Sequence, residues 1–393
     1  MEEKAHPKIV CLSNVYEQAY HDIRGEKVAR CLTTPFRRAL FQCLETASAS
    51  ELILLSSPPK TADRRTGKWL RAAETKFFSH RQFFCCNWDA PKWRVPLAWF
   101  FYARHALRHV RSGDLVVIDN YEFIYIAAAW LLKIFRRVTF VLVYLDGKHL
   151  IDRSSQRGLS WLAETCGRPL FSGVITANPF LGERLPASLP KETVPGFIQD
   201  IPTSMTPAPA GDVCFLYAGT LARSHGIDLL LESLPHLPER GWRLTIAGEG
   251  PLSDEVIHVT QNLRWQGRVE YCQAMPPEIF EQLLVANHVG LNCQRASHPI
   301  SNVTFPSKIF TYLSAGLMVI SSKAGAVETL CGRACLYYDD ESAQSLADAM
   351  KTAIVNFPAA RQGVALSEIS SRYSTAATTA RLQKLLRAVG FVP

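Results

Sequence analysis

The sequence predicts an α/β protein of two doubly wound domains that face a cleft, and three observations support this prediction. The chain has 393 residues, more than the roughly 250 to 300 at which single cores stop growing. Short apolar runs alternate with helical stretches, which is typical of parallel sheets covered on both faces. A segment with three prolines and no periodicity, residues 199–212, is the candidate linker.

Each half contains six apolar runs that are candidate strands. In the first domain, residues 1–198, they are residues 8–14, 51–57, 82–88, 114–120, 138–146 and 173–178. In the second domain, residues 213–372, they are residues 213–219, 242–248, 269–273, 288–293, 317–320 and 334–339. We expect the last helical stretch, residues 373–393, to pack back on the first domain. Ligands of open α/β sheets bind at the carboxyl ends of the strands, so the function should be found there.

Composition excludes several classes of protein. The eleven cysteines include no C-x-x-C pair, which favours a reducing cytoplasm over a disulfide framework or a zinc site. The acidic N-terminus does not resemble a signal peptide. The most apolar segment, residues 125–145, is interrupted by Lys133, Arg136 and Arg137 before it reaches the ~20 apolar residues of a membrane span.

Charge is divided unevenly between the halves. Residues 1–196 contain 28 Lys+Arg and 18 Asp+Glu, a net of +10, whereas residues 197–393 contain 15 and 17, a net of −2. The basic half should therefore face an anionic partner: nucleic acid, a membrane surface or a phosphorylated substrate. No helix-turn-helix, RRM or zinc signature accompanies the charge, so no nucleic-acid partner is expected.

One basic stretch, residues 91–113, interleaves large aromatic residues with arginines. It contains Trp99, Arg104, Arg108 and Arg111. One interpretation is the core packing of an amphipathic helix, and the other is an interfacial helix resting on anionic lipid.

Three loops at strand ends of the second half contain residues suited to binding phosphate. The first contains Gly219, Thr220, Arg223 and His225, the second Gly248, Glu249 and Gly250, and the third Pro306, Ser307 and Lys308 at the start of a helix. A helix N-terminus offers unsatisfied N–H groups and partial positive charge. A lysine at that end is favourable when an anion lies opposite.

The order and spacing of these loops resemble the C-terminal domain of GT-B glycosyltransferases, most closely the large family 4 group. The matching residues are Tyr217-Ala218-Gly219-Thr220, Gly248-Glu249-Gly250-Pro251, and Pro306-Ser307-Lys308 followed by Tyr312, Gly316, Val319-Ile320, Gly325 and Glu328. The resemblance implies two Rossmann-like domains and a nucleotide-diphosphate sugar as donor. It also implies that these loops, with Glu328, bind the donor.

The sequence departs from the family pattern at four positions. Thr220 and His225 replace an arginine and a lysine that bind the diphosphate in the family, and Arg223 or Lys308 could supply the charge. The family's two glutamates fall on Val303 and Thr311, and the second of them ordinarily contacts the donor ribose.

A general acid or base should come from the first domain. Asp119 and Asp146 end strands and His149 follows closely, although strand-end caps and hydrogen-bonded turn residues are the simpler interpretation of each taken alone.

We therefore expect a cytoplasmic, metal-independent glycosyltransferase at the inner face of the membrane, with no cofactor and a polyprenyl-diphosphate-linked glycan as acceptor. Three alternatives stay open: a non-catalytic binding subunit, an enzyme with a soluble acceptor, or a GT-B epimerase or phosphorylase.

Overall fold

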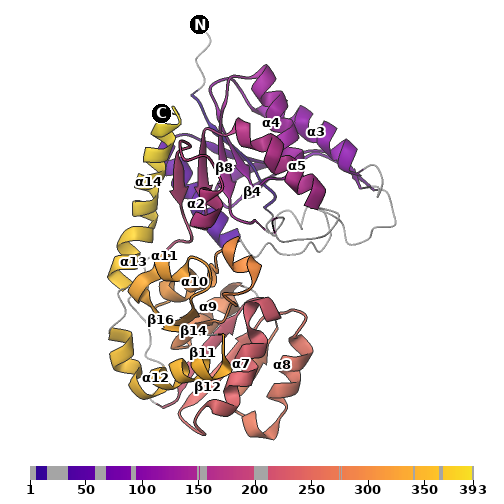
Figure 1. Cartoon of the computed structure of the whole chain (residues 1–393). Helices are drawn as coiled ribbons and strands as arrows, with labels where there is room; N and C mark the ends of the chain where they lie inside the picture. Colours follow the sequence, from indigo (N-terminus) through magenta and orange to yellow (C-terminus); the bar gives the residue numbers. More distant parts are fainter. Residues whose placement is uncertain are drawn as a thin grey trace. The chain divides into compact units, whose positions relative to one another are not determined.

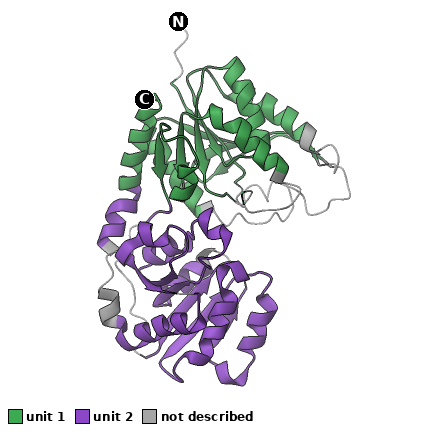
Figure 2. Cartoon of the chain, viewed as in Figure 1, with its two compact units in different colours: residues 1–194, 376–393 green, residues 195–375 purple. Residues whose placement is uncertain are grey.

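The computed structural model describes residues 6–15, 34–57, 68–89, 94–147, 150, 157–198, 211–273, 275, 277–339, 341–362 and 366–391 (Figure 1). The chain divides into two compact units, residues 1–194 with 376–393 and residues 195–375 (Figure 2). Each unit contains its own sheet, as the sequence predicts. Of the expected linker, residues 199–210 lie outside the described residues.

The first unit is built on an eight-stranded sheet. Its order is β10-β9-β8-β7-β1-β2-β5-β4, and every pairing is parallel except that of β4 with β5. The central strands are buried along their whole length because helices cover both faces. The strands are β1 (Ile9–Leu12), β2 (Leu52–Ser56), β4 (Ala73–Phe77), β5 (His80–Phe84), β7 (Leu115–Asp119), β8 (Thr139–Tyr144), β9 (Gly173–Thr176) and β10 (Lys191–Thr193).

Helices of the first unit form two layers. Helices α3, α4 and α5 lie side by side on one face of the sheet, and α2 and α14 lie on the other (Figure 1). The last helix belongs to this unit, where Arg381 forms an ion pair of 2.8 Å with Glu192 at the sheet edge. The helices are α2 (Thr34–Ser48), α3 (Arg94–His109), α4 (Phe123–Phe135), α5 (Arg157–Gly167), η2 (Arg168–Leu170), α6 (Pro179–Glu183) and α14 (Thr375–Ala388).

The second unit contains a six-stranded sheet in which every pairing is parallel. Its order is β13-β12-β11-β14-β15-β16. The strands are β11 (Val213–Ala218), β12 (Trp242–Ala247), β13 (Val269–Cys272), β14 (Val289–Asn292), β15 (Met318–Ser322) and β16 (Cys335–Tyr338). The helices are η3 (Arg223–His225), α7 (Ile227–Ser233), η4 (Leu234–His236), α8 (Ser253–Thr260), η5 (Leu263–Trp265), α9 (Pro277–Val285), η6 (Pro299–Asn302), α10 (Lys308–Ser314), α11 (Val327–Cys331), η7 (Gly332–Ala334), α12 (Ala343–Gln362) and α13 (Leu366–Tyr373).

The predicted strand over residues 82–88 is wrong in one respect, because the chain forms two strands there. Strand β5 ends at Phe84, and after two residues β6 (Asn87–Asp89) pairs antiparallel with β3 (Lys68–Leu70) in a separate two-stranded ribbon. The apolar run of residues 82–88 carried no signal for this change of partner.

Candidate functional site

Two glycine turns lie against each other at the carboxyl edge of the second sheet. Gly219 follows β11 with a φ of 147°, and Gly248 follows the neighbouring β12 with a φ of 141°. A Cβ on Gly248 would lie 1.9 Å from the Gly219 carbonyl oxygen, and one on Gly250 would lie 2.3 Å from the Leu221 carbonyl oxygen. Only glycine permits both these φ values and this spacing, so a ligand can approach the backbone closely here.

Lys308 reaches these turns from the start of α10. Its Nζ lies 3.9 Å from the centroid of the Tyr217 ring and would lie 3.1 Å from a Cβ placed on Gly219. The Nζ is buried and has no hydrogen-bond partner among the described residues. Burial lowers the pKa of Lys308 to about 8. An unpaired buried ammonium is costly, so this is a place where a bound anion would be favourable.

Tyr312, one turn further along α10, fixes the strand that leads to Gly219. Its hydroxyl accepts a hydrogen bond of 2.8 Å from the Ala218 N–H, the last residue of β11. The tyrosine ring lies over Gly290 of β14, where a Cβ would be 2.3 Å from the ring. The tyrosine and the lysine are four residues apart, so one helix turn places both side chains on the same strand end.

The loop after Gly219 is held in place by a residue that the sequence analysis did not identify. Arg295 donates to the Arg223 carbonyl at 3.2 Å and forms ion pairs with Asp228 at 3.0 Å and Glu341 at 3.4 Å. The Arg223 guanidinium is exposed and has no partner in the described part of the chain. His225 contacts Ser224 at 3.0 Å. Arg223 is therefore the cation of this loop that remains available for a ligand.

The other donor-side residues expected from the sequence occupy varied positions. Thr220 accepts a hydrogen bond of 2.9 Å at its carbonyl from the Tyr217 hydroxyl, and Pro306 is buried. The side chains of Ser307, Thr311 and Glu249 are exposed. Within the described ranges, none of these three side chains is held by a hydrogen bond that would define its role.

Two positions of the family's acidic pattern contribute no carboxylate in this structure. Val303 is buried in the apolar interior of the unit, and Thr311 lies on the exposed side of α10. Glu328, in the first turn of α11, lies 3.6 Å from Lys323, which also pairs with Asp339 at 2.8 Å. The structure thus gives Glu328 a partner within the protein.

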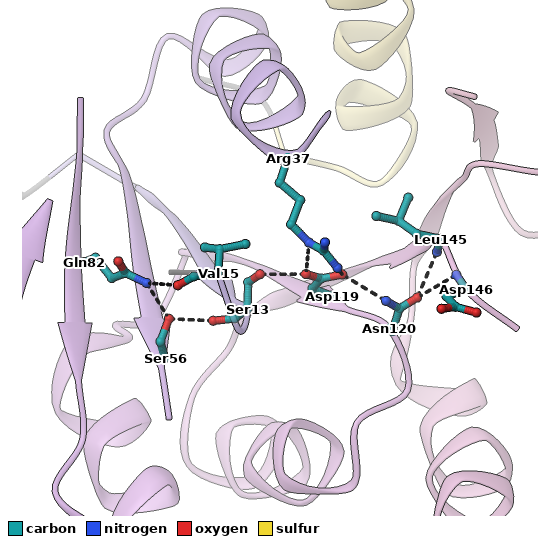
Figure 3. A network of polar contacts seen from close by, with 9 residues as sticks. All are labelled: Ser13, Val15, Arg37, Ser56, Gln82, Asp119, Asn120, Leu145 and Asp146. Atoms are coloured by element: carbon teal, nitrogen blue, oxygen red, sulfur yellow. Dashed lines mark hydrogen bonds and ion pairs between the residues drawn. The ribbon is translucent and has the colours of Figure 1, made fainter. Parts of the chain in front are cut away.

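Asp119 lies at the centre of a buried polar network at the carboxyl edge of the first sheet (Figure 3). Its carboxylate accepts hydrogen bonds from Ser13 at 2.6 Å and from Arg37 at 2.6 and 3.1 Å. The side-chain amide of Asn120 donates to it at 3.2 Å. Four hydrogen bonds from three partners therefore occupy this carboxylate. Asp119 holds the network together, and its role as an acid or base stays a prediction.

The network continues in both directions along the sheet (Figure 3). On one side, Ser56 donates to the Ser13 carbonyl at 2.6 Å, and Gln82 donates to the Ser56 hydroxyl at 2.8 Å. On the other side, the Asn120 side-chain oxygen accepts from the backbone N–H groups of Leu145 at 2.9 Å and Asp146 at 3.1 Å. Five neighbouring strands are joined in this way.

Asp146 is the expected acid or base that this network positions directly. Asn120 fixes its backbone through the 3.1 Å bond, and the residue is half-buried. His149 lies outside the described residues. Arg37 and Ser13 were missed, because neither stands in a motif and Arg37 is separated from Asp119 by 82 positions.

Helix α3 carries the expected membrane-facing residues. Its Tyr102 is buried and donates to the Leu55 carbonyl at 2.8 Å, which fixes the inner face of the helix. Trp99, Arg104 and Arg108 are exposed on the helix, and Arg111 is exposed just beyond its end. None of the helices in the described part of the chain has both the length and the hydropathy of a membrane span.

The two-unit architecture is that of the GT-B glycosyltransferases, whose two domains are Rossmann-like. Sucrose-phosphate synthase from Thermosynechococcus elongatus superposes with a TM-score of 0.72 at 15% identity, covering 98% of this chain and 99% of that chain. Anabaena HepE in complex with UDP superposes with a TM-score of 0.65 at 15% identity, covering 97% and 100%. At such identities the likeness concerns the fold, and it confirms the predicted GT-B fold.

Sequence comparison relates the second unit to one family of these enzymes. Residues 212–356 match the model of the family "Glycosyl transferases group 1". The gpi3 subunit of the phosphatidylinositol N-acetylglucosaminyltransferase of Schizosaccharomyces pombe is 27% identical over 134 residues, 34% of this chain and 28% of that protein. The human counterpart, also a subunit of a phosphatidylinositol N-acetylglucosaminyltransferase, is 25% identical over 158 residues, 39% and 31%. The matched segments span less than a third of these relatives, and they confirm the resemblance to group 1 glycosyltransferases.

Proposed function

We propose that this chain is a glycosyltransferase that binds a nucleotide-diphosphate sugar at the carboxyl edge of its second sheet. The observation that carries this function is the buried Nζ of Lys308, which lies beside the Gly219 turn without a partner among the described residues. A diphosphate placed there would meet the ammonium, the backbone of both glycine turns and the exposed Arg223 guanidinium. The UDP in the similarly folded HepE structure supports a nucleoside diphosphate as the ligand class.

The chemistry is a displacement at the anomeric carbon of the sugar. The bond between that carbon and the diphosphate oxygen breaks, an acceptor hydroxyl forms the new bond, and its proton passes to a base. Lys308 and Arg223 would stabilise the negative charge that develops on the leaving diphosphate, so we propose that no metal ion is required. Asp146 and His149 are the proposed sources of the base.

The proposed acceptor is a lipid-linked glycan, such as one carried on polyprenyl diphosphate, in polysaccharide biosynthesis. Two observations support an acceptor at a membrane: the net charge of +10 in the first half of the chain, and the names of the relatives, which specify phosphatidylinositol. The enzyme would act at the inner face of the membrane as a peripheral protein.

A non-catalytic binding subunit is the second candidate. Two features favour it: Val303 and Thr311 offer no carboxylate where the family has glutamates, and Asp119 is occupied by its hydrogen bonds. Slow donor hydrolysis without acceptor distinguishes the two candidates, because a catalyst releases nucleoside diphosphate and a binding subunit does not.

The donor site is tested by isothermal calorimetry with UDP-, GDP- and ADP-sugars. We expect Lys308→Ala to weaken binding of the preferred donor by roughly 1.5 to 3 kcal/mol, the range for charge-assisted hydrogen bonds. Lys351→Ala is the matched control, since that lysine lies at the surface on α12 and pairs with Asp348. Equal donor affinity of the parent and the Lys308 variant would falsify this site.

A further inference from the structure

The two-stranded ribbon of the first unit displays a pair of exposed tryptophans. Trp69 of β3 and Trp88 of β6 are directly opposite each other in the antiparallel register. They are 49% and 44% exposed. Opposed residues on one face of an antiparallel pair have neighbouring side chains, so the two indoles form one apolar surface. Large exposed aromatics are unfavourable in water and mark interaction sites when they gather.

Helix α3 extends this surface. The Trp69 ring packs edge-on against Phe101 with centroids 5.3 Å apart, and β6 packs along the same helix. Phe100, whose ring centroid lies 5.5 Å from that of Phe101, is 57% exposed. We use the name aromatic ribbon face for Trp69, Trp88 and Phe100.

Basic residues continue from the aromatic ribbon face along α3. Phe100, Arg104 and Arg108 are spaced by four residues, which places them in one row on the helix surface. All three are exposed. An apolar aromatic group beside a row of arginines matches the two layers of a bilayer surface, where indoles enter the interfacial region and cations meet anionic headgroups.

The position of this face in the fold has a functional meaning. Strand β5 runs parallel to β2, and β6 follows it after two residues, while β4 runs antiparallel to β5 and follows β3. The ribbon therefore leaves the sheet at the carboxyl edge, the same edge at which Ser13, Asp119 and Asp146 lie.

We infer that the aromatic ribbon face, with Arg104 and Arg108, docks the first unit on an anionic bilayer and so holds this carboxyl edge at the membrane surface. The partner is the lipid bilayer itself. Only the purpose of this docking rests on the proposed function: a lipid-linked acceptor would reach the protein at the sheet edge that carries Asp146. Vesicle binding and donor binding are separate measurements.

Flotation with vesicles tests this docking surface. The parent should bind vesicles of equal phosphatidylglycerol and phosphatidylcholine at low salt, and bind less at high salt or on phosphatidylcholine alone. Trp69→Ser with Trp88→Ser should lower the partition coefficient by about tenfold or more, because both indoles leave the interface. Arg104→Glu with Arg108→Glu should lower it by a similar factor on anionic vesicles only.

Leu263→Ser is the matched control, because Leu263 is 84% exposed in the second unit and lies far from α3 in sequence. It should bind vesicles as the parent does. Brominated lipids should quench parent tryptophan fluorescence, with less quenching in the double tryptophan variant. Phe100→Ser provides an independent variant of the same face, and circular dichroism verifies folding of each protein.

Several results would overturn the inference. They are unchanged vesicle binding by the double tryptophan variant, equal loss in the Leu263 control, or a parent that binds UDP in calorimetry without binding vesicles. The last result leaves the proposed donor site intact. Loss of soluble oligosaccharide binding with unchanged vesicle binding would instead assign the ribbon as a sugar-stacking platform.

Discussion

Two charged residues differ in how far their hydrogen-bonding groups are paired: Lys308 at the start of α10, and Asp119 at the end of β7. The Asp119 carboxylate accepts four hydrogen bonds, whereas the Lys308 ammonium is buried with no hydrogen-bond partner among the described residues. A satisfied buried charge rigidifies the protein, and an unsatisfied one lowers stability until a ligand binds. The sequence could identify both residues as strand-end or helix-start groups. It could not distinguish their roles, because Arg37 approaches Asp119 from a helix that no motif connects to it.

The unpaired lysine predicts a gain of stability on removal of its charge. Burial lowers the pKa of Lys308 from 10.5 to about 8, so between these pH values the unfolded state binds more protons than the folded state. Stability of the parent should therefore rise as pH increases from about 8 to 10.5, by on the order of 3 kcal/mol in total. Urea unfolding across this range measures it.

Lys308→Met should remove this pH dependence of stability, raise the stability at pH 7 and weaken donor binding. Lys351→Met, the control at the surface, should leave the pH dependence as in the parent. Two results would contradict the burial of a charged ammonium. One is a parent protein whose stability does not rise above pH 8, and the other is a Lys308→Met variant whose stability still rises there.

Donor binding should take up a proton in the same range. A diphosphate beside Lys308 raises the pKa of this lysine back toward its ordinary value, because an opposite charge favours the ammonium. Between about pH 8 and 9 calorimetry in buffers of different ionisation enthalpy should show net proton uptake, and the donor affinity should fall as pH increases further. Equal heats in all buffers would contradict direct contact between the phosphate and the lysine.

Asn120 combines an unusual backbone with three hydrogen bonds. Its φ is 60°, and its side chain joins Asp119 to the backbone at Leu145 and Asp146. Asn120→Gly should cost about 1 to 3 kcal/mol from the lost hydrogen bonds alone. Asn120→Ala should cost roughly 1 kcal/mol more, because alanine is strained at this φ. Urea denaturation compares them, and equal stability of the two variants would rule out backbone strain.

At the scale of elements, apolar runs located the buried strands to within about two residues, since a strand covered on both faces must be apolar throughout. The sequence missed β4, the edge strand Ala73–Phe77, where buried and exposed residues alternate. It also merged β5 and β6, because the pairing partner, and not composition, decides where a strand leaves a sheet. The sequence therefore did not predict the aromatic ribbon face as a unit.

The stacked glycine turns predict a large effect of one methyl group. Gly248→Ala would place a Cβ 1.9 Å from the Gly219 carbonyl oxygen, so the two turns must separate. We expect a loss of roughly 2 kcal/mol or more in stability, together with weaker donor binding. Gly267→Ala is the control, because its φ is also positive, at 74°, but nothing lies within 4 Å of the added Cβ. Similar donor affinities in the two variants would show that the turns do not contact the ligand.

At the scale of the whole molecule, the first unit is assembled from two distant segments. Helix α14 buries Leu382, Leu385 and Leu386, and a Cβ on Gly173 of β9 would lie 2.6 Å from Val389. Leu382→Ala should destabilise this unit by roughly 2 to 5 kcal/mol, the usual cost of a core cavity. Leu263→Ala, at an exposed position, should change little. Urea unfolding distinguishes the two variants, and equal midpoints would mean that α14 contributes nothing to the core of this unit.

This discontinuous assembly reverses the usual order of events during synthesis on the ribosome. Domains generally fold from the N-terminus as they emerge, but here the second unit, residues 195–375, is continuous and emerges complete before the helix that finishes the first unit. The face of the first sheet beneath α14 therefore stays uncovered while another 180 or so residues are translated. This takes about 10 to 40 s at ordinary elongation rates. A nascent chain whose residues 1–375 have all left the ribosome should have a protease-resistant second unit and a protease-sensitive first unit.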